Sequence, residues 1–119
     1  MPAYAAGYAV SGEIVTLFSG ESPTPSATAA SQAVRLRSNA PFSVAGHFAG
    51  DPGVFEADVQ AACLDSDTEY QTVANGNITT VDSTNYTFRY DGLPVGAKFV
   101  RLLLRSRTNA VALSAQFSQ

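Results

Sequence analysis

The stretch of residues 96–117 reads GAKFVRLLLRSRTNAVALSAQF and decides the fold. Two apolar runs, Phe99–Leu104 and Val111–Phe117, flank a polar connection at residues 106–109. The second run alternates between apolar and small or polar residues, which is the period of a strand with one buried face. Two such runs around a polar connection predict two strands joined by a short turn. We therefore expect this pair to form the centre of an antiparallel β-sandwich.

Similar short runs recur along the rest of the chain and are separated by turn residues. Asn75-Gly76 predicts a two-residue hairpin turn between the runs that flank it. The Pro-, Ser- and Thr-rich stretch 20–31 predicts a long exposed loop. About eight or nine short, evenly spaced strands predict an all-β, antiparallel, jelly-roll-like sandwich. The runs outside the opening pair are residues 13–18, 33–37, 42–48, 54–63, 70–73, 78–81 and 86–90.

The chain of 119 residues has the length of one domain. Residues 1–12 have no clear period, and we expect them to form an N-terminal arm before a single sandwich domain at 13–119. The arm is either a loosely held tail or a segment that lays Tyr4 and Tyr8 on a neighbouring subunit. Tyrosine suits the second role because it supplies contact area at low entropic cost.

Charged residues make up only 14% of the chain, and its net charge is −3. That balance argues against binding to nucleic acid or to an anionic membrane, since both need a basic surface. Small neutral polar residues suit a surface that contacts another protein. No apolar run approaches the ~18 residues of a membrane span. The N-terminus lacks the features of a signal peptide, so we expect synthesis in the cytoplasm.

No catalytic or cofactor motif is present in the sequence, and we expect no enzyme activity and no cofactor. His47 is the only histidine, and no nucleophile motif accompanies it, so we expect it on a strand at the surface or at a subunit seam. Asp65, Asp67 and Glu69 alternate like the start of a calcium loop, but the sixth and twelfth positions do not fit one. A solvated acidic turn is the favoured interpretation, with an irregular calcium site left open.

Three further features have both a structural and a functional interpretation. Arg101, Arg105 and Arg107 cluster on one run, either as a solvated strand face or as a contact site, in which Arg101 and Arg105 would bind a partner. The single cysteine, Cys63, excludes an intrachain disulfide and is expected to behave as a small buried hydrophobe. The tyrosines on adjacent expected strands form either core pairs or a sugar-stacking face. These tyrosines are Tyr70, Tyr86 and Tyr90.

The second half of the chain resembles small β-sandwich structural proteins of tailed bacteriophages. The resemblance covers roughly residues 42–119 and is carried by FEADVQAA at 55–62, AKFVRLLL at 97–104 and NAVALSA at 109–115. The family most similar is that of capsid decoration, or cement, proteins. The resemblance implies a non-enzymatic virion protein on the capsid surface that binds the major capsid protein or other virion subunits. It also implies a homo-oligomer, a dimer or a trimer.

The run AKFVRL also resembles the late strands of discoidin-like jelly rolls, which bind sugars or lipids. The chain lacks the paired cysteines that many of those domains carry. Two hypotheses follow for function. The first is a capsid decoration protein that stabilises an assembled phage head, and the alternative is a carbohydrate-binding jelly-roll module.

Overall fold

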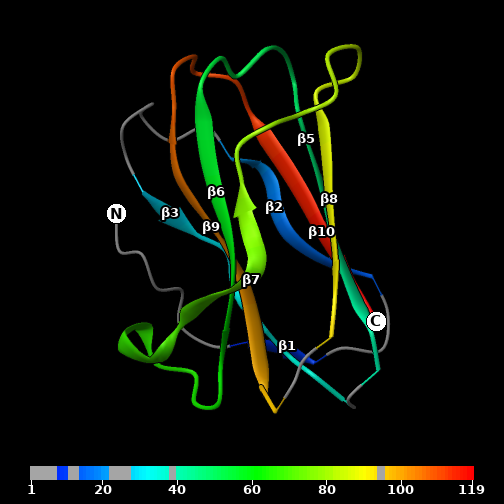
Figure 1. Ribbon diagram of the computed structural model, residues 1–119, viewed down its shortest axis with the longest axis vertical. Coiled ribbons are helices and arrows are strands. Elements are labelled where there is room, and N and C mark those ends of the chain that lie inside the picture. The colour runs from blue at the N-terminus through cyan, green and yellow to red at the C-terminus, as the bar shows by residue number, and fades with distance from the viewer. Residues whose placement is uncertain (1–7, 11–13, 22–27, 38–39, 94–95) are drawn as a thin grey trace.

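A computed structural model describes residues 8–10, 14–21, 28–37, 40–93 and 96–119, which fold into two sheets packed face to face (Figure 1). The only helical element among them is the short 3-10 turn η1 (Asp67–Glu69). The all-β sandwich predicted from the sequence is therefore confirmed. The six-stranded sheet has the order β1 (Tyr8–Val10), β4 (Ala33–Arg35), β9 (Phe99–Arg107), β6 (Phe55–Ala62) and β7 (Gln71–Ile78), with β3 (Ala29–Ala30) also paired to β9. The four-stranded sheet has the order β2 (Val15–Glu21), β10 (Leu113–Ser118), β5 (Phe42–Phe48) and β8 (Thr87–Gly92).

The strand order is that of a jelly roll. Among the described strands, only β6 and β7 are both consecutive in the chain and paired in one sheet. The other connections lead to the opposite sheet, except that β3 and β4 follow one another along the same side of β9. As a result β4-β9-β6-β7 faces β2-β10-β5-β8. Every described pairing is antiparallel except the parallel pairing of β1 with β4.

The predicted hairpin between the two C-terminal runs is wrong. Both runs form strands, but β9 lies in the six-stranded sheet and β10 lies in the four-stranded sheet. Their connection crosses the sandwich and is held by the turn between β5 and β6, since Thr108 donates its backbone N–H to Val54 at 2.8 Å and Asn109 donates to Pro52 at 3.0 Å. Side-chain alternation specifies each strand and its buried face, but it does not specify the pairing partner.

The Asn75-Gly76 hairpin is also wrong, because β7 runs through it as one strand. Asp58 pairs with Asn77 and Gln60 pairs with Thr72, so residues 73–76 bulge opposite Val59 alone. Asn75 adopts a positive φ of 61°, as a hairpin turn would also require. Gly76 is needed because a Cβ there would lie 2.8 Å from the carbonyl oxygen of Val59. Turn and bulge need the same backbone freedom, so the dipeptide cannot distinguish them.

Two strands were not expected from the sequence. β1 lies within the expected N-terminal arm, and β3 lies in the stretch expected to be irregular. The hydroxyl of Ser31, next to β3, accepts a hydrogen bond of 2.9 Å from the N–H of Leu102, while its own N–H donates to the Leu102 carbonyl. A serine side chain thus continues the ladder where regular pairing ends. The structure therefore has ten strands among the described residues rather than eight or nine.

The core lies between the central strands of the two sheets. Alternate residues of β9 and β10 are fully or almost fully buried, on the faces predicted from the sequence. Phenylalanine rings fill the remaining space, with Phe48 and Phe55 in edge contact at 5.0 Å between centroids and Phe42 stacked on Phe117 at 5.6 Å. The buried residues of these inward faces are Val100, Leu102, Leu104, Leu113, Ala115 and Phe117, and β9 also buries Arg101, Leu103 and Arg107.

This packing can be tested by a substitution at Gly46. The ring of Phe88 occupies the space that a side chain at position 46 would need. A Cβ at Gly46 would stand 2.4 Å from Cζ of Phe88. We predict that Gly46→Ala lowers the free energy of unfolding by about 1–3 kcal/mol, the usual cost of overpacking a core. Urea denaturation followed by circular dichroism measures the change. Ala45→Ser, at the adjacent exposed position, should change it by less than about 0.5 kcal/mol, and an equal effect at both positions would contradict the packing argument.

Candidate functional site

Arg101 and Arg105 of the arginine cluster lie on the outer side of the six-stranded sheet, where Arg101 is only 4% exposed. Arg107 is also buried, but beyond a register shift it pairs with the core residue Phe55. The Nε of Arg101 donates to Oε1 of Gln60 at 2.9 Å, and its NH1 atom lies 2.9 Å from Oδ1 of Asp67. The guanidinium carbon lies 4.1 Å from the centroid of the Tyr70 ring, a cation–π contact. These contacts occupy a buried guanidinium, which leaves little of it for a partner. The expectation of a wholly solvated arginine face is therefore wrong.

Arg105 is more exposed than Arg101 and forms an ion pair with the buried carboxylate of Asp58. Asn77 donates to the same carboxylate at 2.6 Å and to Glu56 at 2.8 Å. A buried carboxylate needs such partners because an unpaired buried charge is strongly destabilising. The outer side of the six-stranded sheet thus carries a connected polar network that ties β6, β7 and β9 together. Of the other two predicted contact residues, Tyr4 lies outside the described residues and Tyr8 begins β1.

The three tyrosines proposed for sugar stacking do not share a surface. Tyr70 is buried beneath Arg101, and its hydroxyl donates to Asp65 at 2.7 Å. Tyr86 and Tyr90 pack against the core between the sheets, and Tyr90 donates its hydroxyl to the carbonyl of Ala74 at 3.0 Å. Burial raises the pKa of the Tyr90 phenol. These residues therefore do not form a sugar-stacking face, and they serve in packing, which was the other interpretation.

The acidic stretch before Tyr70 is used for internal contacts. Asp65 accepts from Tyr70, and Asp67 pairs with Arg101. In the part of the chain that the structure describes, no group of three or more His, Cys, Asp or Glu side chains is placed to hold a metal ion. The turn is thus less solvated than the sequence suggested, because two of its carboxylates have protein partners.

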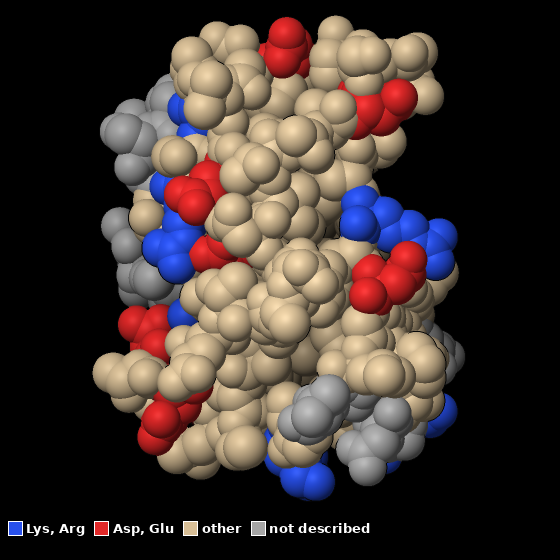
Figure 2. All heavy atoms as spheres, viewed as in Figure 1, with Lys and Arg blue, Asp and Glu red and all other residues tan. Residues whose placement is uncertain are grey.

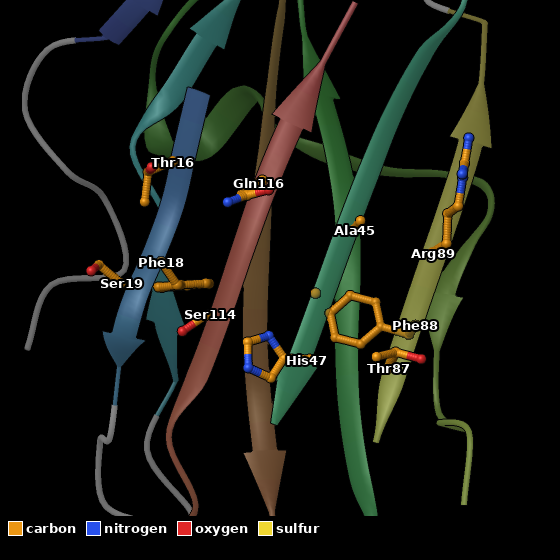
Figure 3. A pocket seen from close by; sticks show the side chains of 11 residues that line it. Thr16, Phe18, Ser19, Ala45, His47, Thr87, Phe88, Arg89, Ser114 and Gln116 are labelled. Carbon is orange, nitrogen blue, oxygen red and sulfur yellow. The ribbon is translucent and has the colours of Figure 1, made fainter. Parts of the chain in front are cut away.

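The outer face of the four-stranded sheet carries a shallow groove of about 660 Å³ lined mainly by polar side chains (Figure 3). His47 is exposed on β5, as the sequence predicted for a strand histidine, and Gln116 stands on the neighbouring strand β10. Hydroxyl, amide, imidazole and guanidinium groups therefore share one sheet surface. The other polar side chains along the groove are Thr16, Ser19, Thr87, Arg89 and Ser114.

Beside this groove, Arg89 and Asp91 form an exposed ion pair along β8, with 3.0 Å between Nε and Oδ1. The Ser43 hydroxyl on β5 donates to the same carboxylate. The hydrogen bond from Ser43, and after it the hydrogen bond from Arg89, lower the pKa of the Asp91 carboxyl below its usual value of 3.8. Asp91 therefore carries its negative charge at neutral pH and below.

A second groove, of about 990 Å³, opens between the two sheets beside β7 and β8. Leu64 and Leu93 line it although they are 61% and 62% exposed. Cys63 also lines it and is exposed, so the expectation of a buried cysteine is wrong. The face on which β7 lies is uncharged over its middle, and charged side chains gather toward its margins (Figure 2). The remaining apolar lining consists of Ala61, Ala62, Val73, Ala74, Tyr90 and Ala97.

The inter-sheet groove was not predicted, although one feature of the sequence indicates it: two large apolar residues that lie in polar connections. Leu64 opens an acidic loop, and Leu93 sits in a turn that contains Gly and Pro. A large apolar side chain in a polar connection has no strand face to place it in the core. Such residues are candidates for contact with another molecule, and here the fold brings two of them to one groove.

Comparison of the chain with protein-family models, with curated proteins and with solved structures gives no match. None of the described residues belongs to a helix long and apolar enough to cross a membrane.

Arg101 provides a test of the polar network. We predict that Arg101→Lys lowers the free energy of unfolding by about 1–3 kcal/mol, because lysine cannot replace both hydrogen bonds and would leave buried groups unsatisfied. Arg89→Lys, in an exposed ion pair, should change it by less than about 0.5 kcal/mol. Thermal and urea unfolding of both variants measure the difference, and a neutral Arg101→Lys would show that the contacts of Arg101 do not stabilise the sheet.

Proposed function

We propose that the chain is a non-enzymatic structural protein that attaches to a phage head as a capsid decoration protein. The observation that carries the proposal is the groove between the sheets, whose lining is mainly apolar and whose only charged members are the carboxylates Glu69 and Asp91. Such a surface, on a face that is uncharged over its middle, is suited to contact with protein rather than with nucleic acid. Jelly rolls serve in viral shell proteins and in lectins, so the fold agrees with the proposal but does not select it.

The proposed mechanism is burial of apolar side chains against shell subunits. Of the four exposed large hydrophobic residues in the described chain, Leu64 and Leu93 flank one groove. Covering one leucine side chain contributes about 1.5–3 kcal/mol. Many copies bound to one lattice would stabilise the shell, since each one adds contacts across subunit boundaries.

The test is co-sedimentation with undecorated heads of the phage that encodes the chain. We predict that Leu64→Asp and Leu93→Asp each weaken attachment at least tenfold, because about 1.4 kcal/mol corresponds to a factor of ten. Val54→Asp is the matched control, since Val54 is 81% exposed but lies outside the groove. Equal binding by all three variants would remove the groove from the mechanism, and failure of the unmodified chain to sediment with heads would overturn the proposed function.

The polar groove on the four-stranded sheet supports a second candidate, a carbohydrate-binding module. Sugars are bound through hydroxyl groups, and this groove presents donors and acceptors from four adjacent strands (Figure 3). The residues that would carry it are His47 and Gln116 rather than the tyrosines considered from the sequence.

A calorimetric screen against a panel of oligosaccharides tests this candidate. We predict that His47→Ala and Gln116→Ala each reduce the affinity for a bound sugar about fivefold to tenfold, the effect of losing a hydrogen bond of about 1 kcal/mol. Ser118→Ala, on the same strand and outside the groove, should leave affinity unchanged. No binding across the panel would exclude the candidate for the sugars tested.

A further inference from the structure

The four outer strands of the two sheets differ in how well they could accept another strand. β1 has only three residues, the pairing of β7 is broken by its bulge, and the pairing of β2 with β10 contains two register shifts. β8 alone pairs with its neighbour over six consecutive residues without a shift. Regular edge strands present unpaired backbone groups and are the places where further strands add, whereas short or bulged edges resist this. Among the described strands, β8 is therefore the edge best suited to accept one.

The backbone groups that β8 directs outward belong to two charged residues. Phe48 donates its N–H to the carbonyl of Tyr86 at 3.0 Å, which fixes the phase of the ladder between β5 and β8. In an antiparallel pair the bonding direction alternates along the strand, so Phe88 and Tyr90 bond toward β5. The residues between and after them, Arg89 and Asp91, direct their N–H and C=O groups away from the sheet.

The outward side of Thr87 is already partly used. Its carbonyl accepts a hydrogen bond of 2.9 Å from the N–H of Asp82 in the preceding turn. The segment that can accept a new strand is therefore short and centred on Tyr90. The basic Arg89 lies on one side of this centre and the acidic Asp91 on the other.

This arrangement of charges is self-complementary. We propose that the chain forms a two-fold symmetric homodimer in which β8 pairs antiparallel with β8 of a second copy, Tyr90 opposite Tyr90. In that register Arg89 stands opposite Asp91 of the second copy, and Asp91 stands opposite Arg89 of the second copy. Both residues direct their backbone groups outward, so the register also satisfies the hydrogen bonds of the new ladder.

Neighbouring registers are unfavourable for a physical reason. A shift that keeps outward groups paired moves the symmetry axis to Arg89 or to Asp91. The first places two guanidinium groups directly opposite each other, and the second places two carboxylates opposite each other. Like charges in opposed positions destabilise a strand pair, and opposite charges stabilise it. The sequence Arg89-Tyr90-Asp91 thus selects one register out of three.

The dimer would also set the positions of the two inter-sheet grooves relative to each other. Arg89 and Asp91 alternate with Tyr90 along β8, and Tyr90 lies on the inner face, where it lines the groove with Leu93. Asp91 also lines the groove. Opposed residues of a strand pair have Cβ atoms about 4.5–5.5 Å apart, so the two Tyr90 rings would meet at the axis. The grooves of the two copies would then lie on either side of that axis, and the two four-stranded sheets would join into one.

The test is the mass of the isolated chain over a range of concentrations, by native mass spectrometry and sedimentation velocity. We expect a species of twice the 12.4 kDa chain mass. Arg89→Asp leaves two acidic residues on the edge and Asp91→Arg leaves two basic ones, so each variant alone should dissociate at least tenfold more readily than the unmodified chain. An equimolar mixture of these two variants should form a heterodimer, and the double exchange R89D/D91R should restore the homodimer.

A heterodimer in the mixture distinguishes loss of strand pairing from a general loss of stability. Two variants that were merely unstable would not form a dimer when they are mixed. Arg35→Asp is the matched control, since it changes the net charge as Arg89→Asp does, and Arg35 is exposed on β4, at the far side of the other sheet. A chain that stays at 12.4 kDa at every concentration would overturn the proposal. So would single-charge variants that still form homodimers, or a mixture that forms no heterodimer. The measurement uses no phage heads, so the dimer and the proposed function can fail independently.

Discussion

The structure depends on two strands, each of which lies in the interior of its own sheet and presents a mainly apolar face to the other sheet. β9 contributes Val100, Leu102 and Leu104 to the space between the sheets, and β10 contributes Leu113, Ala115 and Phe117. Because the side-chain period of a strand is two, neither strand can slip by one residue without exposing its whole apolar set. Every other described strand pairs directly or through one neighbour with β9 or β10, so the register of these two positions the rest.

The same alternation explains why the outer side of the six-stranded sheet is not a free binding surface. Arg101 and Asp58 point away from the core but are nevertheless buried. Each has charged or amide partners on adjacent elements, which offset the cost of removing the charge from water. A side chain that holds its own sheet together in this way has little capacity left for a partner. The surfaces available for binding are thus the outer face of the four-stranded sheet and the side where the two sheets part.

The sequence predicted strands and buried faces well because both depend on local alternation. It predicted β5 at residues 42–48 with its actual bounds, and it identified the buried faces of β9 and β10. It failed where the outcome depends on distant partners. The pairing of β9 and β10 with other strands depends on the loop around Pro52, and the burial of Arg101 depends on Tyr70 and Asp67, which are far away in the chain. Cys63 follows an alternating strand and was expected inside, but the strand ends at Ala62 and the cysteine falls in the groove between the sheets.

Edge strands of sandwiches are commonly protected by charged side chains, and the charges of β8 could serve that purpose alone. Protection, however, is best achieved by charges of one sign, because any two copies then repel each other in every register. β8 instead carries one basic and one acidic residue two positions apart, with its backbone groups directed outward at both. With a two-fold axis between them, opposite charges face each other in a single register and attract. In the two neighbouring registers like charges face each other and repel. An edge of this kind limits indefinite sheet growth and still permits one defined pairing, since the second copy of β8 uses the only regular edge that the described part of each chain offers.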